Sequence, residues 1–166
     1  VQCVCGLAQI ENNLKETPAF ERLAQLKQLA SNRSRTDWLT FNSSFESGNL
    51  LLALASPEQS LPTYDLYMQN DVNTKGCTQW FYFSVVSRAR GKARFRLMNF
   101  VRKAQLSKAT SLYQKGMKVL CSQDSFEWRR TGTAITYGKT EEGKCFYALE
   151  FIHEFDLSGK VTYFAN

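Results

Sequence analysis

The sequence predicts an all-β fold, an antiparallel β-sandwich of about eight or nine strands with an N-terminal lead-in helix. Three observations lead to this fold class. Short apolar runs recur after Trp38, and each is closed by Gly, Asn or Asp. Helical periodicity nearly vanishes over the same stretch. With 166 residues, 43% of them hydrophobic and 13% aromatic, the chain has enough apolar material for one packed core.

The lead-in is expected over residues 1–36 and the sandwich over residues 37–166. Thr17 can cap a helix, and Pro18 suits its first turn. Apolar residues then follow at helical spacing, at Phe20, Leu23, Leu26, Leu29 and Ala30. Two interpretations stay open, because this helix can pack on the edge of the sandwich or can end a preceding region.

The central strand of the sandwich is expected from Thr78 to Ser87. In an extended chain the side chains of Trp80 and Tyr82 lie on one face of the strand. The opposite face carries Phe81, Phe83 and Val85. Both faces of the strand are therefore apolar, which is typical of a strand that is covered on two sides.

Short or alternating apolar runs predict the other strands, at residues 38–41, 51–55, 63–69, 92–100, 117–121, 134–137, 145–155 and 161–164. Two prolines indicate a loop at 56–62, and turn residues indicate connections at 70–76 and 88–91. Residues 101–110 are expected to form a basic loop. In the strand 92–100, Phe95 and Leu97 face inward, and the exposed face carries Lys92, Arg94 and Arg96.

The net charge of +6 is unevenly distributed. No Asp or Glu occurs from Val72 through Gln123, although this interval holds eleven of the 21 Lys and Arg residues. Such a basic interval suggests an anionic partner, which can be nucleic acid, a membrane surface or an acidic peptide. For any single base, a solvated surface position is the simpler interpretation.

The sequence offers little for catalysis or metal binding. Its one histidine, His153, lies on the apolar side of its strand, so a structural role is favoured over a zinc site. Residues 132–140 resemble a phosphate-binding loop, but the glycine spacing is one residue too long and two acids follow, which favours a strand and hairpin. The five scattered cysteines suggest reduced thiols.

No stretch of the sequence is long and apolar enough to predict a membrane span. The longest apolar run, Leu50–Ala55, is far too short to cross a bilayer. The chain does not begin with Met, as expected for a piece of a longer protein.

Eight short motifs follow one another along the chain: Phe45-Glu-Ser-Gly-Asn-Leu50, Tyr64-Asp-Leu66, Asp71-Val-Asn-Thr74, Gln79-Trp-Phe-Tyr-Phe83, Phe95-Arg-Leu-Met-Asn-Phe100, Ser111-Leu-Tyr-Gln-Lys-Gly-Met117, Trp128-Arg-Arg-Thr-Gly132 and Thr162-Tyr-Phe-Ala165. Each motif is modest by itself. In this order, over about residues 41–166, they resemble the N-terminal β-domain of cytosolic carboxypeptidases. The chain departs from the family pattern at Val119, where members usually have proline.

The resemblance implies a domain that directly precedes a zinc carboxypeptidase catalytic domain. Members of this family remove glutamate from acidic protein tails, above all those of tubulin. The resemblance places zinc and the catalytic residues in the following domain, so this chain alone is expected to be non-enzymatic, without catalytic residues, metal ligands or cofactor. It also implies a cytoplasmic location, with association to microtubules, centrioles or cilia. Within the motifs, a scaffold role is expected for Glu46, Gly48, Asn49, Asp71, Asn73, Trp80, Asn99, Gly116 and Trp128.

The expected partners are the catalytic domain and acidic tails such as polyglutamylated tubulin. Exposed bases raise the local concentration of a polyanion, and the candidates for binding it are Arg94, Arg96, Arg102, Lys103 and Lys108. Two alternatives stay open: a stand-alone anion-binding sandwich for nucleic acid or acidic lipid, and a purely structural domain. Burial of the aromatic strand would remove a stacking platform for nucleic acid, and scattered aspartates do not predict a calcium-dependent membrane domain.

Overall fold

A computed structural model describes residues 38–56, 60–70, 78–102, 111–139, 146–156 and 159–166. These residues belong to a compact unit that spans Asp37–Asn166. The expected lead-in helix and the separate role of residues 1–36 lie outside the described residues and stay predictions. No helix among the described residues is long and apolar enough to cross a membrane.

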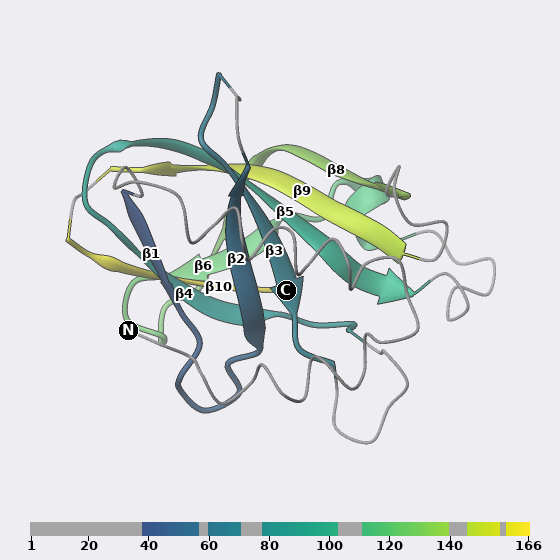
Figure 1. Cartoon of the computed structure of the whole chain (residues 1–166), viewed down its shortest axis with the longest axis horizontal. Helices are drawn as coiled ribbons and strands as arrows, with labels where there is room; N and C mark the ends of the chain where they lie inside the picture. Colours follow the sequence, from purple (N-terminus) through teal and green to yellow (C-terminus); the bar gives the residue numbers. More distant parts are fainter. Residues whose placement is uncertain (1–37, 57–59, 71–77, 103–110, 140–145, 157–158) are drawn as a thin grey trace. The chain divides into compact units, whose positions relative to one another are not determined.

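The described residues form ten strands and one short 3-10 helix (Figure 1). The elements are β1 (Leu39–Asn42), β2 (Leu50–Ser56), β3 (Thr63–Met68), β4 (Tyr82–Ser87), β5 (Gly91–Arg102), η2 (Leu112–Lys115), β6 (Val119–Ser122), β7 (Arg129–Thr131), β8 (Thr133–Lys139), β9 (Phe146–Phe155) and β10 (Val161–Ala165). Sheet A has the strand order β1-β4-β10-β6-β7, and sheet B has the order β2-β3-β5-β9-β8.

The two sheets pack face to face through phenylalanines. Phe83 and Phe164 of sheet A and Phe95 and Phe151 of sheet B are completely buried. The ring of Phe95 lies 6.3 Å from that of Phe83 and 5.5 Å from that of Phe164, and the rings of Phe151 and Phe164 lie 5.9 Å apart. Rings at such centroid distances interact favourably beyond their simple burial. The predicted all-β sandwich is therefore confirmed.

Two details of the predicted fold are wrong. The described part contains ten strands instead of eight or nine, because the three-residue strand β7 is polar and shows no apolar alternation. The sandwich is also not wholly antiparallel, since β3 and β5 pair in parallel, with Thr63 opposite Arg94 and Leu66 opposite Leu97. This pair arises because the intervening strand β4 belongs to the other sheet, so the chain returns to sheet B in the same direction.

The expected central strand begins at Tyr82 instead of Thr78. It lies inside sheet A, between β1 and β10, and Phe83 and Val85 are buried as predicted. On its opposite face Tyr82 and Val86 are only partly buried, so the expected cover on both sides is incomplete. Asparagine side chains take the place of strand partners just before β4. The Asn49 amide donates to the Trp80 carbonyl and accepts from the Tyr82 N–H, at 3.0 and 2.8 Å. The Asn166 amide donates to the Gln79 carbonyl and accepts from the Phe81 N–H, at 3.1 and 3.2 Å.

Candidate functional site

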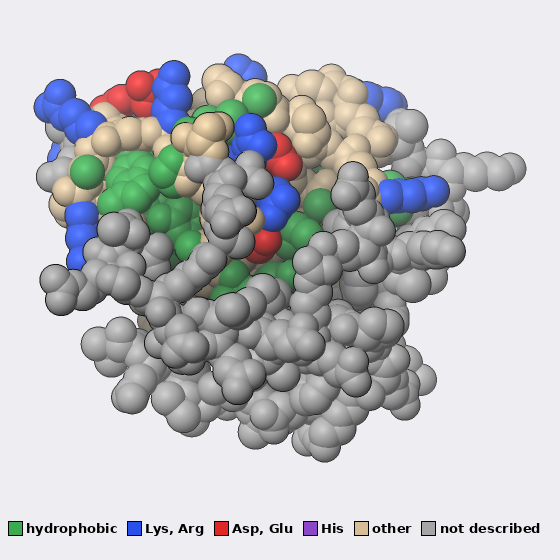
Figure 2. Space-filling view, turned by 45° about the horizontal axis from the view of Figure 1, so that its top comes forward, with side chains coloured by type: hydrophobic (Ala, Val, Ile, Leu, Met, Phe, Trp, Pro, Cys, Tyr) green, Lys and Arg blue, Asp and Glu red, His purple; other side chains and the backbone are tan. Residues whose placement is uncertain are grey.

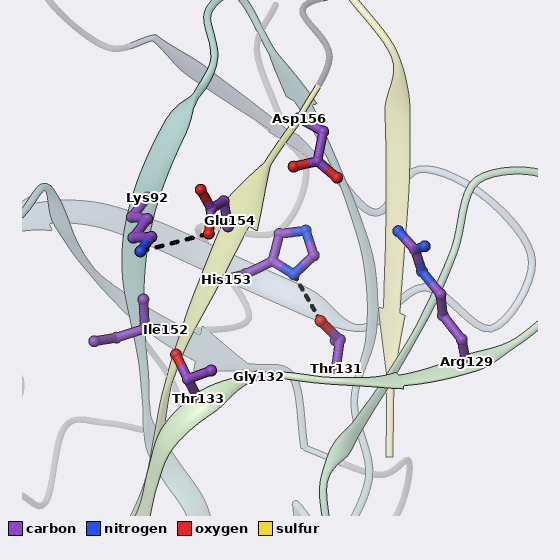
Figure 3. Close-up of a pocket in the computed structure, with 9 residues that line it drawn as sticks. All are labelled: Lys92, Arg129, Thr131, Gly132, Thr133, Ile152, His153, Glu154 and Asp156. Atoms are coloured by element: carbon purple, nitrogen blue, oxygen red, sulfur yellow. Dashed lines mark hydrogen bonds and ion pairs between the residues drawn. The ribbon is translucent and has the colours of Figure 1, made fainter.

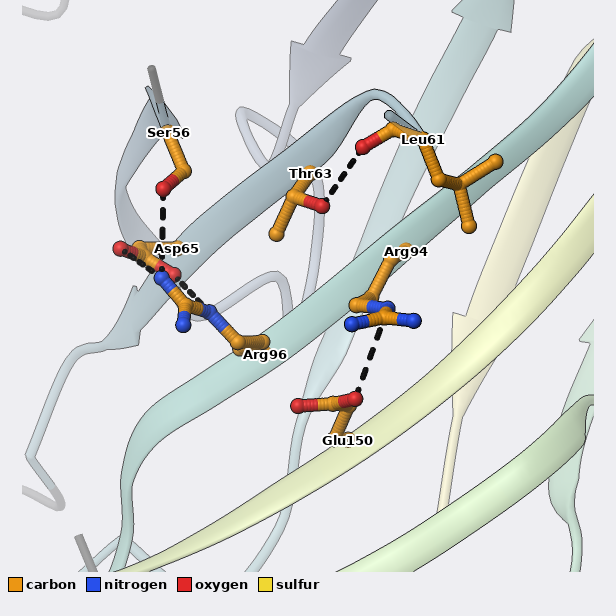
Figure 4. A network of polar contacts seen from close by, with 7 residues as sticks. All are labelled: Ser56, Leu61, Thr63, Asp65, Arg94, Arg96 and Glu150. Carbon is orange, nitrogen blue, oxygen red and sulfur yellow. Dashed lines mark hydrogen bonds and ion pairs between the residues drawn. The ribbon is translucent and has the colours of Figure 1, made fainter. Parts of the chain in front are cut away.

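Two of the bases predicted to bind an acidic substrate, Arg94 and Arg96, lie on the outer face of sheet B, where acids from neighbouring strands meet them. Arg96 makes a two-point ion pair with Asp65 of β3, with Nε to Oδ1 at 2.5 Å and Nη2 to Oδ2 at 2.8 Å (Figure 4). The same Nη2 donates to Ser56 Oγ at 3.4 Å. Two parallel hydrogen bonds between a guanidinium and a carboxylate fix the orientation of both groups.

Two further ion pairs lie along β5. Arg94 Nε is 3.5 Å from Glu150 Oε1 of β9, and Lys92 Nζ is 3.5 Å from Glu154 Oε2 of the same strand. The side chains of Lys92 and Glu154 are more than half exposed, whereas those of Arg94 and Glu150 are about one-third exposed. The outward side chains of β5 therefore form a row of three cations, each beside a carboxylate.

This row, which we call the ion-pair row, pairs three bases of the acid-free interval with acids that lie outside it in the sequence. The acid-free interval contains β5, and the acids that balance it come from β3 and β9 on either side. In Figure 2, blue and red side chains accordingly lie next to one another on the described surface. A substrate carboxylate at Arg94 or Arg96 would have to compete with Glu150 or Asp65. Binding of an acidic substrate by these two arginines stays a prediction.

The other predicted binding residues lie at the end of β5 or beyond it. Arg102 is the last residue of β5 instead of a loop residue, and only its backbone is described. Lys103 and Lys108 lie outside the described residues, as do the scaffold candidates Asp71 and Asn73.

Exposed bases also gather at the end of the sandwich where β4 turns into β5. Arg88 and Arg90 lie in that turn and are exposed, as is Lys160 in the turn before β10. The two turns are joined, because the Gly159 N–H donates to the Ser87 carbonyl oxygen at 2.5 Å. We call Arg88, Arg90 and Lys160 the basic turns. The sequence indicated that the interval from Val72 to Gln123 is basic, but the predicted binding residues begin further along the chain, at Arg94.

The single histidine is buried beside a small pocket. Its Nδ1 lies 2.9 Å from Thr131 Oγ1 (Figure 3). Its ring packs edge-on against Phe155 and Phe164. Burial, with a smaller contribution from the Arg129 charge, lowers the pKa of His153 to about 4, while Asp156 opposes this shift. The pocket has a volume of about 280 Å³ and is lined by two cations and two carboxylates, so it carries no net charge. His153 is thus a neutral structural residue, as expected.

The described residues do not fit a zinc ion. No group of three or more His, Cys, Asp and Glu side chains gathers among them. The histidine nitrogen Nδ1 already contacts a threonine, and Cys121 is a buried free thiol.

Several motif residues have clear scaffold roles. Asn49 holds the segment before β4, and Asn99 holds β3 through paired hydrogen bonds to the Met68 backbone at 2.8 and 2.9 Å. Gly116 caps η2 in the left-handed region, with φ of 93°. Trp128 donates from Nε1 to the Ser125 carbonyl and packs on Tyr82. These contacts are compatible with the scaffold role expected for the motif residues, which stays a prediction.

A second surface was missed by sequence reasoning. Four aromatic side chains lie outside the core and contact one another on the outer face of sheet A, and they are Phe45, Tyr82, Trp128 and Tyr163; the exposed Phe126 lies two residues before Trp128 in the adjoining turn. We call this set the aromatic face. Tyr82 alternates with Phe83 and Tyr163 with Phe164, so strand alternation could have indicated it, but turn residues at 45 and 126 could not be placed from sequence.

The fold defines a class of protein: a β-sandwich domain whose motif residues join its elements. The chain belongs to the family described as cytosolic carboxypeptidase N-terminal domain, which matches residues 41–164. The predicted family resemblance is confirmed.

The relatives are much longer than this chain. It is 36% identical over 138 residues to cytosolic carboxypeptidase 2 of Xenopus tropicalis, a match that covers 77% of this chain and 13% of the relative. It is 33% identical over 151 residues to cytosolic carboxypeptidase 3 of Mus musculus, covering 85% and 14%. The chain therefore spans only a small part, the N-terminal domain, of the proteins that it matches.

Solved structures share the fold. The chain is similar to a metallo-carboxypeptidase from Burkholderia cenocepacia, with a TM-score of 0.51 and 15% identity over 76% of this chain and 28% of the other. At this level of identity the likeness concerns the fold alone.

Proposed function

We propose that this chain is the non-catalytic N-terminal domain of a cytosolic metallocarboxypeptidase that removes glutamate from acidic protein tails such as those of tubulin. The observation that carries the proposal is the family match over residues 41–164, together with the small share of each relative that the chain covers. In this proposal the catalytic domain holds the zinc ion, and the enzyme acts in the cytoplasm on microtubules, including those of centrioles and cilia.

Within such an enzyme, the domain packs on the catalytic domain and attracts the acidic tail. The basic turns support the second role better than the ion-pair row, because Arg88, Arg90 and Lys160 are exposed, whereas Arg94 and Arg96 already contact carboxylates. Attraction between solvated charges is screened beyond about 10 Å at 0.1 M salt. The basic turns should therefore affect capture of the tail mainly at low salt.

The test is charge reversal at the basic turns in the natural full-length enzyme. Arg88→Glu combined with Arg90→Glu should raise KM for a polyglutamylated peptide about threefold to tenfold at low salt, while kcat stays unchanged, because only the encounter is affected. The rise should shrink as salt is added. KM and kcat are obtained from the rate of glutamate release.

A matched control reverses two exposed bases near the other end of sheet B, Lys115→Glu with Lys139→Glu. An equal rise in KM for both variants would assign the effect to net charge. An unchanged KM for both would leave the domain a structural role only, a role that the ion-pair row favours because its cations are balanced inside the domain.

A further inference from the structure

The outer faces of the two sheets differ in chemistry. Sheet B presents the ion-pair row. On sheet A, the residues that alternate with buried Phe83, Val85, Cys121 and Phe164 point outward. On the four strands β1, β4, β10 and β6 all of these outward residues are uncharged, and they are Thr40, Asn42, Tyr82, Ser84, Val86, Leu120, Ser122, Val161, Tyr163 and Ala165. On the described strands of sheet A, the charged residue that pairs with one of them is Arg130 of the edge strand β7, which lies opposite Leu120.

The aromatic face borders a shallow, open hollow on this side. The ring of Tyr82 lies 4.9 Å from that of Phe45, 5.8 Å from that of Trp128 and 6.1 Å from that of Tyr163. Phe45, Tyr82 and Tyr163 wall a hollow of about 420 Å³, together with Glu46, Ser47 and Ser125. A hollow with aromatic walls is suited to receive an apolar side chain.

Phe126 follows Ser125, one of the residues that wall this hollow, in the turn between β6 and β7. It is 88% exposed, and its turn is fixed by hydrogen bonds: Asp124 Oδ1 accepts from the N–H groups of Phe126 and Glu127, each at 2.9 Å. Ser122 Oγ accepts from the Ser125 N–H at 2.9 Å. A turn that is already ordered loses little entropy when its apolar side chain is buried by a partner. An exposed phenylalanine held in this way is therefore suited to docking.

The family match indicates which partner lies close to this face. The matched domain is N-terminal and ends at residue 164, inside β10, which lies in the middle of sheet A. In members of the family, the sequence that follows the domain thus starts next to Tyr163. A domain joined there is present at a high effective concentration beside the aromatic face.

We propose that the aromatic face docks on the carboxypeptidase domain of the same protein, with Phe126 inserted into that domain and the hollow filled by one of its apolar side chains. This inference rests on the proposed function, which supplies the carboxypeptidase domain. The basic turns and the ion-pair row then stay solvent-facing.

The direct test is photo-crosslinking in the natural full-length enzyme, with benzoylphenylalanine in place of Phe126. The matched control carries the same group in place of Leu112, another large apolar side chain that the described part of the chain exposes, at 60%. Position 126 should link within one chain to peptides of the carboxypeptidase domain, and position 112 should not. Mass spectrometry identifies the linked peptides.

Two results would overturn the docking proposal. A product of twice the mass at position 126 would assign the face to a second copy. Absence of any link at 126, in a preparation that releases glutamate normally, would leave the proposed function intact and the docking face wrong. If the same preparation released no glutamate before crosslinking, the proposed function itself would fail.

A second measurement avoids the crosslinker. Phe126→Ser leaves the core untouched because the side chain is exposed. Loss of one central aromatic anchor should speed proteolytic separation of the two domains roughly tenfold. Leu112→Ser should leave the rate unchanged, and equal rates for the two variants would contradict the proposal.

Discussion

At the scale of single residues, asparagine side chains form the hydrogen bonds that the backbone of a neighbouring strand would otherwise form. Asn49, Asn99 and Asn166 each present a carbonyl and an amino group to the main chain of one neighbouring segment. A buried backbone N–H or C=O without a partner is destabilising. These three side chains therefore satisfy the backbone where the regular ladders stop.

Gly48 stands where no side chain fits. A Cβ there would lie 2.2 Å from the Ser43 carbonyl oxygen, a backbone atom that cannot move aside easily. The Gly48→Ala substitution should lower the free energy of unfolding by about 2–3 kcal/mol, because the turn must shift and take Asn49 with it. Urea unfolding measures the loss.

The matched control is Gly138→Ala in β8, where a Cβ would meet no atom within 4 Å. Its unfolding free energy should change by less than about 0.5 kcal/mol. Similar losses of unfolding free energy in the two variants would show that the contact with the Ser43 carbonyl oxygen is not what excludes a side chain at position 48.

His153 should make stability depend on pH. Its pKa is lowered to about 4 in the folded chain, first by burial and then by Arg129, and Asp156 opposes the shift. The unfolded chain therefore takes up a proton as pH falls from about 6.5 toward 4, whereas the folded chain does not. Stability is highest above this range, and about 1–2 kcal/mol should be lost between about pH 7 and pH 5.

The measurement is urea unfolding at several pH values, compared with His153→Gln. The glutamine does not titrate. Between the two pH values the unfolding free energy of the variant should therefore fall by about 1–2 kcal/mol less than that of the wild type. If the wild type and the variant showed the same pH dependence, His153 would not be the titrating group. Lys92 and Glu154 line the same pocket and are unchanged in the variant.

At the scale of elements, β5 is held between β3 and β9 by charge as well as by backbone pairing. A double-mutant cycle on Arg96 and Asp65 should give a coupling free energy of about 1 kcal/mol, because this pair is two-pointed and partly shielded. The variants are Arg96→Met, Asp65→Asn and the double variant. Thermal or urea unfolding supplies the four free energies.

The same cycle on Lys92 and Glu154 is the control. Both side chains are more than half exposed, so the coupling should be about 0.3 kcal/mol and should vanish in high salt. Equal couplings for the two pairs would contradict the role given to shielding at Arg96.

Most strands could be predicted from sequence, because a short apolar run or apolar alternation marks the strands that border the core. β7 could not, since Arg129-Arg-Thr131 offers no alternation and is fixed by its ladder to β6. The ion pairs could not be predicted either. Asp65 is distant in sequence from Arg96, and only the parallel pairing of β3 with β5 brings them together.

At the scale of the whole sandwich, composition predicts that the chain has one core but not what each outer face carries. The described bases Arg88, Arg90 and Lys92 of the basic interval are exposed. Its balance by Glu150 and Glu154 depends on the register of β9 against β5. The aromatic face depends on two turns, which bring Phe45 and Trp128 against Tyr82 of sheet A. Register and turn geometry are set by tertiary contacts, which periodicity alone does not contain.

The position of β10 has a consequence for biosynthesis. This strand comes last among the ten, yet it lies between β4 and β6 in the middle of sheet A. On a ribosome, sheet A cannot close until β10 has left the exit tunnel, so β4 waits with an unpaired edge while the intervening strands are translated. Such an edge is prone to pair with other chains. Because the contacts that complete the sheet are distant in sequence, folding should also be slow for a domain of this size.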